Sequence, residues 1–321
     1  MTMSASRHLV DPQLHTLLDS LPPLALSMEV LQLVREGSRL PPRVFPEPKI
    51  EVKHTIRKVP GPAGAPDVDL YIYQPQVGDG PLPCIYHVHG GGYVIGTPAS
   101  QEMQHKGLAA DLGCCVVSVD YRLAPETRYP GAVEDCYAGL AWLTANAAEL
   151  GVDASHIGVM GESAGGGLAA ALALLVRDRG ELKLSFQHLI YPMIDDRTCV
   201  ASEPHPFTGE FLWTPHNNHF GWSAILGVEP GSEGVSHYAA AARAESVAEL
   251  PPTFISTGSL DLFLEEDMEY ARRLMRAGVP VEFHIYPGGF HAFDFDPDAA
   301  VSVQARRDSR DALAKALSGN K

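Results

Sequence analysis

The sequence predicts an α/β fold in which helices cover both faces of a mostly parallel sheet. From Cys84 onward, short continuous apolar runs alternate with longer amphipathic segments. Strands of a parallel sheet are buried on both faces, so they require such continuous apolar runs. The chain has 321 residues, of which 45% are hydrophobic and 20% are charged. These values are typical of a globular chain with a substantial core.

The strands and helices are expected in a regular order. The segments 50–59 and 68–75 alternate apolar and polar residues, which is typical of strands exposed on one face. Further strands are expected at 84–88, 114–121, 156–161, 185–192, 252–259 and 281–288. Helices are expected at 101–113, 132–151, 163–180, 261–278 and near 301–318.

Two segments stand outside this alternation. The pattern of residues 1–45 predicts amphipathic helices, broken by Pro22–Pro23. Residues of about 197–245 fit no strand–helix unit and carry several aromatic residues and prolines. We expect the two segments to form a cap over a catalytic domain of residues 46–321. The alternative for the insertion is that its aromatic residues only extend the core.

The charge balance restricts the partners of the protein. The chain carries 24 basic and 39 acidic residues, which give a formal net charge of −15 at pH 7. Nucleic acid and anionic membrane surfaces are therefore unsuitable partners. Residues 1–20 lack the apolar stretch of a signal peptide, and no segment approaches the about 18 apolar residues of a membrane helix. We expect a cytoplasmic protein that acts on a small molecule.

The cysteines and histidines give little sign of metal chemistry. The five cysteines form no C-x-x-C pair, which predicts reduced and mostly buried thiols. The nearest group of possible metal ligands lacks the compact spacing of a metal motif. This group consists of His205, His216 and His219 with Glu203 and Glu210. We expect these to be surface side chains and predict no metal site.

A nucleophile is predicted at Ser163. Residues 161–165 read G-E-S-A-G, which is the pattern G-x-S-x-G, between an apolar strand and an Ala/Leu-rich helix. A strand that turns directly into a helix forces its middle residue into a strained conformation and projects the side chain above the sheet. The helix N-terminus behind Ser163 offers N–H groups to an oxyanion. The alternative is a glycine-rich turn with an N-capping serine.

A serine hydroxyl needs a base, and the base needs an orienting acid. Asp261 follows the strand expected at 252–259, and His291 follows the strand expected at 281–288, in the order serine, acid, histidine. We expect Ser163, Asp261 and His291 to be catalytic. Competing carboxylates are Glu265, Glu266, Asp267, Asp294 and Asp296. Asp261 has the alternative role of capping the helix that follows it.

Three consecutive glycines, Gly90–Gly92, follow the strand at 84–88. Bare backbone at this place offers N–H donors for the oxygen that becomes negative during acyl transfer. We expect the N–H groups of Gly91, Gly92 and Ala164 to form an oxyanion hole, with His89 holding the loop. Alanine at Gly91 or Gly92 is then expected to lower kcat far more than stability.

Together, these motifs carry a resemblance to a known family. With HGGGYVIG (89–96), DYRLAPE (120–126), GESAGG (161–166), Asp261 and FHAF (290–293) in order, the chain resembles the hormone-sensitive lipase family of α/β-hydrolases. It looks closest to the bacterial, heroin-esterase-like carboxylesterases. The resemblance implies a mostly parallel eight-stranded sheet with a helical cap, the catalytic residues and oxyanion hole named above, and no cofactor. It also implies esters of short to medium acyl chains as substrates, and a possible homodimer through an edge strand.

Two departures and three open points accompany the resemblance. Glu162 stands where the family often has Asp, and Leu262 stands where it often has Pro. The charged residues Asp120, Arg122 and Glu126 of DYRLAPE are expected to be structural ties. Candidates for the substrate pocket are Phe207, Phe211, Trp213 and Phe220. The alternatives to an esterase are a catalytically inactive, receptor-like binding protein and an amide or lactone hydrolase with the same catalytic residues.

Overall fold

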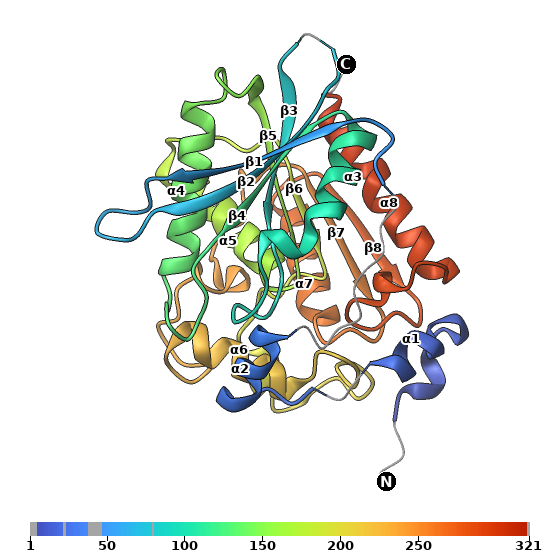
Figure 1. Ribbon diagram of the computed structural model, residues 1–321. Helices are drawn as coiled ribbons and strands as arrows, with labels where there is room; N and C mark the ends of the chain where they lie inside the picture. Colours follow the sequence, from blue (N-terminus) through green and yellow to red (C-terminus); the bar gives the residue numbers. More distant parts are fainter. Residues whose placement is uncertain (1–4, 22–23, 38–46, 79, 320–321) are drawn as a thin grey trace.

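The computed structural model describes residues 5–21, 24–37, 47–78 and 80–319. An eight-stranded sheet, with strand order β1-β2-β4-β3-β5-β6-β7-β8, runs through the molecule (Figure 1). The strands are β1 (Val52–Val59), β2 (Val68–Pro75), β3 (Leu82–Val88), β4 (Cys115–Asp120), β5 (Val152–Glu162), β6 (Gln187–Ile190), β7 (Thr253–Gly258) and β8 (Val281–Tyr286). β2 is antiparallel to β1 and to β4, and the other neighbours are parallel. The predicted fold class is therefore confirmed.

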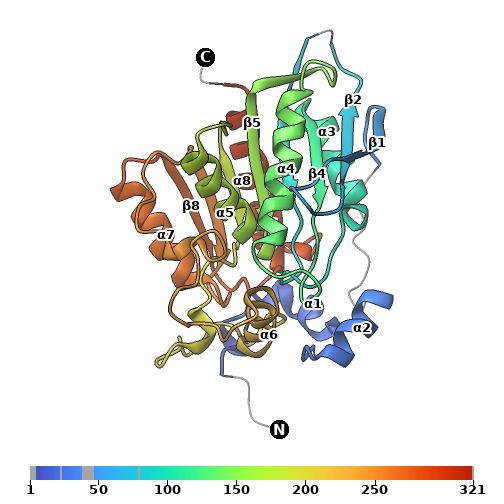
Figure 2. The same cartoon turned by 90° about the vertical axis from the view of Figure 1, so that its left-hand side faces the viewer.

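Helices cover both faces of the sheet, as Figures 1 and 2 show together. One face carries α3 (Glu102–Leu112) and α8 (Ala300–Leu317), and the other carries α4 (Gly131–Ala145), α5 (Ala164–Arg179) and α7 (Leu264–Arg276). Short 3₁₀ helices are η1 (Arg7–Leu9), η2 (Pro12–Leu14), η3 (Pro98–Gln101), η4 (Thr198–Val200), η5 (Ala241–Arg243) and η6 (Phe293–Phe295). β1 and β8 form the two edges of the sheet; dimerisation through an edge strand stays a prediction.

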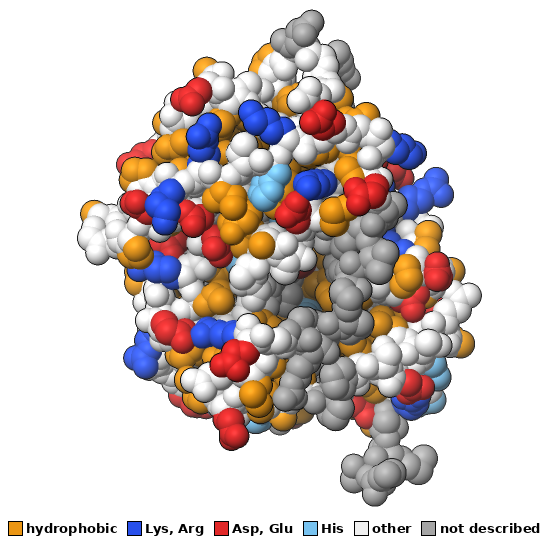
Figure 3. Space-filling view, in the orientation of Figure 1, with side chains coloured by type: hydrophobic (Ala, Val, Ile, Leu, Met, Phe, Trp, Pro, Cys, Tyr) orange, Lys and Arg blue, Asp and Glu red, His pale blue; other side chains and the backbone are white. Residues whose placement is uncertain are grey.

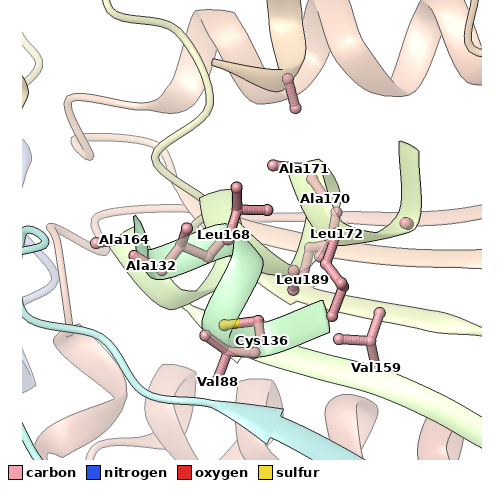
Figure 4. Close-up of a cluster of buried hydrophobic side chains, with 14 of the residues drawn as sticks. Val88, Ala132, Cys136, Val159, Ala164, Leu168, Ala170, Ala171, Leu172 and Leu189 are labelled. Carbon is pink, nitrogen blue, oxygen red and sulfur yellow. The ribbon is translucent and has the colours of Figure 1, made fainter. Parts of the chain in front are cut away.

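The central helix α5 anchors the core beneath the predicted nucleophile. Every residue from Ala164 to Val176 is buried. Figure 4 shows Leu168 and Leu172 of this helix in the same buried cluster as Val88 of β3, Val159 of β5 and Leu189 of β6. Burial of such side chains contributes about 1.5–3 kcal/mol each. The N-terminus of α5, and with it the residue before it, is therefore held rigidly.

One helix is shorter than predicted, and the strand after it is longer. The helix expected over 132–151 ends at Ala145, because the Asn146 side chain donates to the carbonyl of Trp142 and caps it. The chain then turns and reaches β5 at Val152, after Gly151 in a left-handed conformation with φ of 63°. β5 is therefore 11 residues long, where periodicity alone predicted six.

The N-terminal segment lies beside the insertion at the lower end of the sheet in Figure 1. It contains α1 (His15–Ser20) and α2 (Met28–Glu36), and the insertion contains α6 (Pro215–Leu226). The Leu26 N–H donates to Asn217 Oδ1 over 2.9 Å, and His216 Nε2 lies 2.9 Å from the Leu26 carbonyl. Residues 38–46, which include the predicted domain boundary, lie outside the described residues. The cap and the domain limits stay predictions.

The surface and the thiols agree with the composition. Figure 3 shows acidic and basic side chains interspersed with apolar ones over one face. All five cysteines are free; four are buried and Cys199 is half-buried, as predicted for mostly buried thiols. Within the described residues, no helix is long and apolar enough to span a membrane. In the same part of the chain, no cluster of three or more His, Cys, Asp or Glu side chains is arranged to hold a metal ion.

Candidate active site

Ser163 occupies a strained turn between β5 and α5. Its φ of 56° and ψ of −124° lie outside the regions that ordinary residues prefer. A Cβ on Gly161 would lie 2.3 Å from the carbonyl oxygen of Gly165, and a Cβ on Gly165 would lie 2.1 Å from that of Val88. Both flanking positions therefore require glycine. Within residues 80–319, the Ser163 hydroxyl makes no capping hydrogen bond to α5, so the N-cap alternative is wrong.

The structure brings Ser163, His291 and Asp261 into one hydrogen-bonded chain. Ser163 Oγ lies 3.0 Å from His291 Nε2, and His291 Nδ1 lies 2.9 Å from Asp261 Oδ2. The three residues follow β5, β8 and β7, so they meet at the carboxyl edge of the parallel strands, where α/β sheets place their sites. Their exposed fractions are 7%, 5% and 0%. The arrangement matches the geometry of a nucleophile, a base and an orienting acid.

Asp261 also contacts the helix that follows it. Its Oδ1 accepts a hydrogen bond from the Phe263 N–H over 3.0 Å, just before α7 begins at Leu264. The N-cap residue of α7 is Phe263, and no side chain of the described residues caps this helix, so the second oxygen of Asp261 holds the turn before α7 and does not cap the helix itself. The backbone bond fixes the carboxylate plane, and this in turn fixes the orientation of the imidazole.

In the described part of the chain, none of the competing carboxylates is hydrogen bonded to His291, and three of them have other partners. Glu266 accepts from the N–H groups of Ile194 and Asp195, Asp294 accepts from the Tyr191 hydroxyl, and Asp296 accepts from the N–H groups of Asp298 and Ala299. Glu265 is exposed, and Asp267 is fully buried in the first turn of α7. Both imidazole nitrogens of His291 are already occupied by Ser163 and Asp261.

Three aromatic rings enclose the His291 imidazole. Tyr191 and Phe263 meet it edge-on, with ring centroids 4.8 and 5.2 Å away, and Trp213 lies 6.2 Å away at a tilt. These rings limit the access of water to the imidazole, which strengthens its hydrogen bonds. The sequence analysis did not identify Tyr191 or Phe263. Tyr191 is near the end of the strand predicted at 185–192, and Phe263 follows the strand predicted at 252–259, so their positions at the carboxyl edge could have suggested them.

The loop of residues 90–95, here called the glycine loop, carries two of the three N–H groups that are expected to form the oxyanion hole. Within residues 80–319, the N–H groups of Gly91, Gly92 and Ala164 donate to no acceptor of the protein. Gly91 and Gly92 have φ of 126° and 60°, which favour glycine. The loop is closed by hydrogen bonds from the N–H groups of Val94 and Ile95 to the Gly91 carbonyl, over 3.1 and 2.9 Å.

The same loop leaves no room for a Cβ at two of its glycines. A Cβ on Gly91 would lie 2.1 Å from the Ile95 carbonyl oxygen, and a Cβ on Gly92 would lie 2.2 Å from the Trp213 ring. Alanine at either position forces the backbone or the tryptophan to move and is strained by the positive φ. Alanine at Gly91 or Gly92 is therefore expected to cost stability as well, and the prediction that kcat falls far more than stability stays a prediction.

Neighbouring polar residues hold the loop in place. His89 Nδ1 lies 2.9 Å from the Gly90 carbonyl, and its ring stacks on Tyr121 with centroids 4.3 Å apart. Burial lowers the pKa of His89 to about 4, so its imidazole is neutral near pH 7. Within DYRLAPE, Arg122 pairs with Asp135 over 2.7 Å. Glu126 pairs with a residue of the N-terminal segment, Arg35, over 2.8 Å.

The four predicted pocket aromatics lie at different places. Trp213 is buried between Gly92 and His291. Phe211 packs edge-on against Phe290, with centroids 5.9 Å apart. Phe220 is half-buried against the main core, and Phe207 is 40% exposed. Of the four, the structure brings Trp213 to the site.

Comparisons with known proteins place the chain in a family. A family model for the α/β-hydrolase fold matches residues 85–295. Carboxylesterase NlhH of Mycobacterium tuberculosis is 35% identical over 292 residues, covering 88% of each chain, and esterase LipI of the same species is 32% identical over 288 residues, covering 86% of this chain and 85% of LipI.

Solved structures of esterases are similar to the chain over nearly its whole length. A bacterial heroin esterase superposes with a TM-score of 0.88 at 38% identity, covering 97% of this chain and 98% of its own. Esterase LipW of Mycobacterium marinum superposes with a TM-score of 0.79 at 31% identity, covering 96% of each chain. The resemblance predicted from the motifs is confirmed, and the chain belongs to the α/β-hydrolase fold family, in its hormone-sensitive-lipase-like branch.

Proposed function

We propose that the protein is a serine carboxylesterase that hydrolyses esters of short- to medium-chain acids through an acyl-enzyme intermediate. The observation that carries the proposal is the hydrogen-bonded chain Ser163–His291–Asp261, set beside the three unpaired N–H groups of Gly91, Gly92 and Ala164. The names of the relatives, which are carboxylesterases and esterases, support the same reaction class.

The reaction follows from the contacts. Ser163 Oγ attacks the ester carbonyl carbon while His291 Nε2 takes its proton, and the Asp261 carboxylate stabilises the imidazolium that forms. The carbonyl oxygen becomes an oxyanion that accepts from the N–H groups of Gly91, Gly92 and Ala164. When the tetrahedral intermediate collapses, the alcohol leaves with the proton of His291. Water then attacks the acyl-enzyme with His291 as base, which releases the acid and restores Ser163.

The surroundings of the glycine loop favour a short acyl chain. The Trp213 ring lies so close to Gly92 that a single added carbon there would meet it at 2.2 Å. Its indole N–H donates to Asn218 Oδ1 over 3.1 Å, so the ring is held rather than free to swing away. An acyl chain bound next to this loop therefore meets a fixed aromatic wall.

The test is the loss of the nucleophile. Ser163→Ala is expected to lower kcat for p-nitrophenyl acetate by at least about a thousandfold and to abolish labelling by a fluorophosphonate probe, with an unchanged circular dichroism spectrum. A panel of p-nitrophenyl esters from acetate to palmitate is expected to peak at short to medium chains. Substantial hydrolysis by the alanine variant would overturn the serine mechanism. A wild-type protein that neither hydrolyses esters nor reacts with the probe would favour the receptor-like alternative.

A further inference from the structure

A second carboxylate–imidazole pair, Glu162 and His87, lies beside the nucleophile. It is on the side of β5 that faces β3, whereas His291 and Asp261 follow β8 and β7 on the other side of β5. Glu162, the last residue of β5, accepts a hydrogen bond from His87 Nε2 over 2.9 Å. The side-chain amide of Gln101 is a further donor to the same carboxylate. The His87 side chain is fully buried, and that of Glu162 is 12% exposed. Such a carboxylate is costly to bury without donors.

Glu162 belongs to the turn that carries Ser163, here called the nucleophile turn, and it packs against the glycine loop. A Cβ on Gly90 would lie 2.8 Å from the carbonyl oxygen of Glu162, 3.4 Å from its Cγ and 3.4 Å from Ser163 Cβ. The backbone and stem of Glu162 therefore pack directly against the first glycine of the loop. Glu162 and Ser163 therefore both lie against the residue that precedes Gly91 and Gly92.

His87 is the imidazole that holds this carboxylate. Its other nitrogen, Nδ1, lies 2.9 Å from Ser118 Oγ and 3.1 Å from His105 Nε2, so the ring is fixed on both sides. Burial lowers the pKa of His105 well below its ordinary value, and that of His89 to about 4. These two neighbouring imidazoles are neutral near pH 7, and neither is hydrogen bonded to Glu162 in the described structure.

We propose that His87 and Glu162 are positioning residues for the reaction of Ser163. The His87 hydrogen bond fixes the Glu162 side chain, and the fixed side chain keeps the nucleophile turn and the glycine loop at a constant distance from each other. The hydrogen bond also places a donor on a carboxylate next to Ser163, where negative charge opposes formation of the oxyanion. The inference rests on the proposed ester hydrolysis.

Two substitutions at His87 separate this role from simple packing. The side-chain nitrogen of His87→Gln can reach the place of Nε2, which faces Glu162, whereas that of His87→Asn reaches only the place of Nδ1, which faces Ser118. With p-nitrophenyl acetate, H87N is expected to lower kcat about tenfold with KM within about twofold, because a displaced catalytic group slows the chemical step. H87Q is expected to stay within about threefold of wild type.

A double variant provides the decisive control. Adding Glu162→Gln to H87N replaces the carboxylate that has lost its His87 donor by a neutral amide, and is expected to restore kcat to within about threefold of wild type. If packing alone mattered, the double variant would stay as slow as H87N, and H87Q would be equally slow; either result overturns the proposal. If H87N does not fold, Glu162→Gln and Glu162→Leu decide. Gln is expected to stay within about threefold and Leu to lose about tenfold, and equal rates overturn the proposal.

The wild-type protein in the same assay separates the two levels of inference. An inactive wild type that the fluorophosphonate probe does not label overturns the proposed function, and with it the role of His87 and Glu162. An active, labelled wild type with the contrary variant results overturns the positioning role alone.

Discussion

The substitution Asp261→Asn tests the assignment of the orienting acid most directly, because both carboxylate oxygens are in use. Oδ2 accepts from His291 Nδ1 over 2.9 Å, and Oδ1 accepts from the Phe263 N–H over 3.0 Å. Asparagine offers one acceptor and one donor in place of two acceptors. If its oxygen faces Phe263, its NH₂ faces His291 Nδ1 and selects the tautomer whose Nε2–H points at Ser163. That imidazole cannot act as a base.

The opposite orientation of the asparagine is also unfavourable. Its NH₂ would then face the Phe263 N–H, leaving two buried donors without partners, which costs about 1–3 kcal/mol each. With the wrong tautomer dominant, the expected loss in kcat is about 10⁴-fold, or about 5 kcal/mol of transition-state stabilisation. KM for p-nitrophenyl acetate is expected to change little, because Asp261 does not touch the substrate.

Asp267→Asn is the matched control for this experiment. Asp267 is fully buried in the first turn of α7, and burial, followed by the charges of Glu266 and Asp261, raises its pKa well above the ordinary value. Because its surroundings disfavour the charged form, replacement of Asp267 by neutral asparagine is expected to change kcat by less than about threefold. A loss below about tenfold in D261N, or an equal loss in D267N, would refute the assignment of Asp261.

Two further predictions concern the N-terminal segment and pH. Arg35 donates to the Val94 and Ala124 carbonyls over 2.8 Å and pairs with Glu126, whose side chain is 63% exposed. Arg35→Met is expected to raise KM about three- to tenfold, while Glu126→Gln, which removes only the exposed ion pair, has a smaller effect; equal effects would contradict this. Burial lowers the pKa of His188 from 6.5 to about 3, so the unfolded chain takes up this proton first and stability falls as the pH drops below 6.5. Between pH 7.5 and 5, the free energy of unfolding of His188→Gln is expected to fall by about 2 kcal/mol less than that of the wild type, as measured by urea denaturation. An equal fall in both proteins would show that His188 is not buried as a neutral group.

The features that could be predicted from the sequence are those set by local backbone requirements. The turn at Ser163 needs small residues on both sides, because Gly161 and Gly165 leave no room for a Cβ, and this requirement is visible as G-x-S-x-G. Asp261 and His291 could be predicted because each lies in the loop that follows a strand of a parallel sheet. Once the strands are identified, the carboxyl edge of the sheet brings these loops together.

The features that could not be predicted depend on packing between distant segments. Nothing in the spacing of Arg35 and Val94 shows that α2 reaches the glycine loop, since the two are 59 positions apart. His87 and Glu162 are 75 positions apart and meet because β3 and β5 are neighbours in a particular register. The aromatic side chains of Phe207, Phe211 and Phe220 indicated burial or contact with a ligand. Their residue type does not determine which other residues they pack against.

The contacts of the glycine loop connect it to the N-terminal segment, to the insertion and to the turn at Ser163. Gly90 packs against Glu162 of the nucleophile turn, and Gly92 packs against Trp213 of the insertion. The carbonyl of Val94 accepts from Arg35 of the N-terminal segment, while the Val94 N–H donates to Gly91. Three segments that are far apart in sequence therefore fix one short loop, and each acts on a different residue of it. A substrate that displaces Trp213 or loosens α2 is expected to disturb the N–H groups of Gly91 and Gly92 as well, so the fit of the acyl chain beside Trp213 should affect kcat as well as KM.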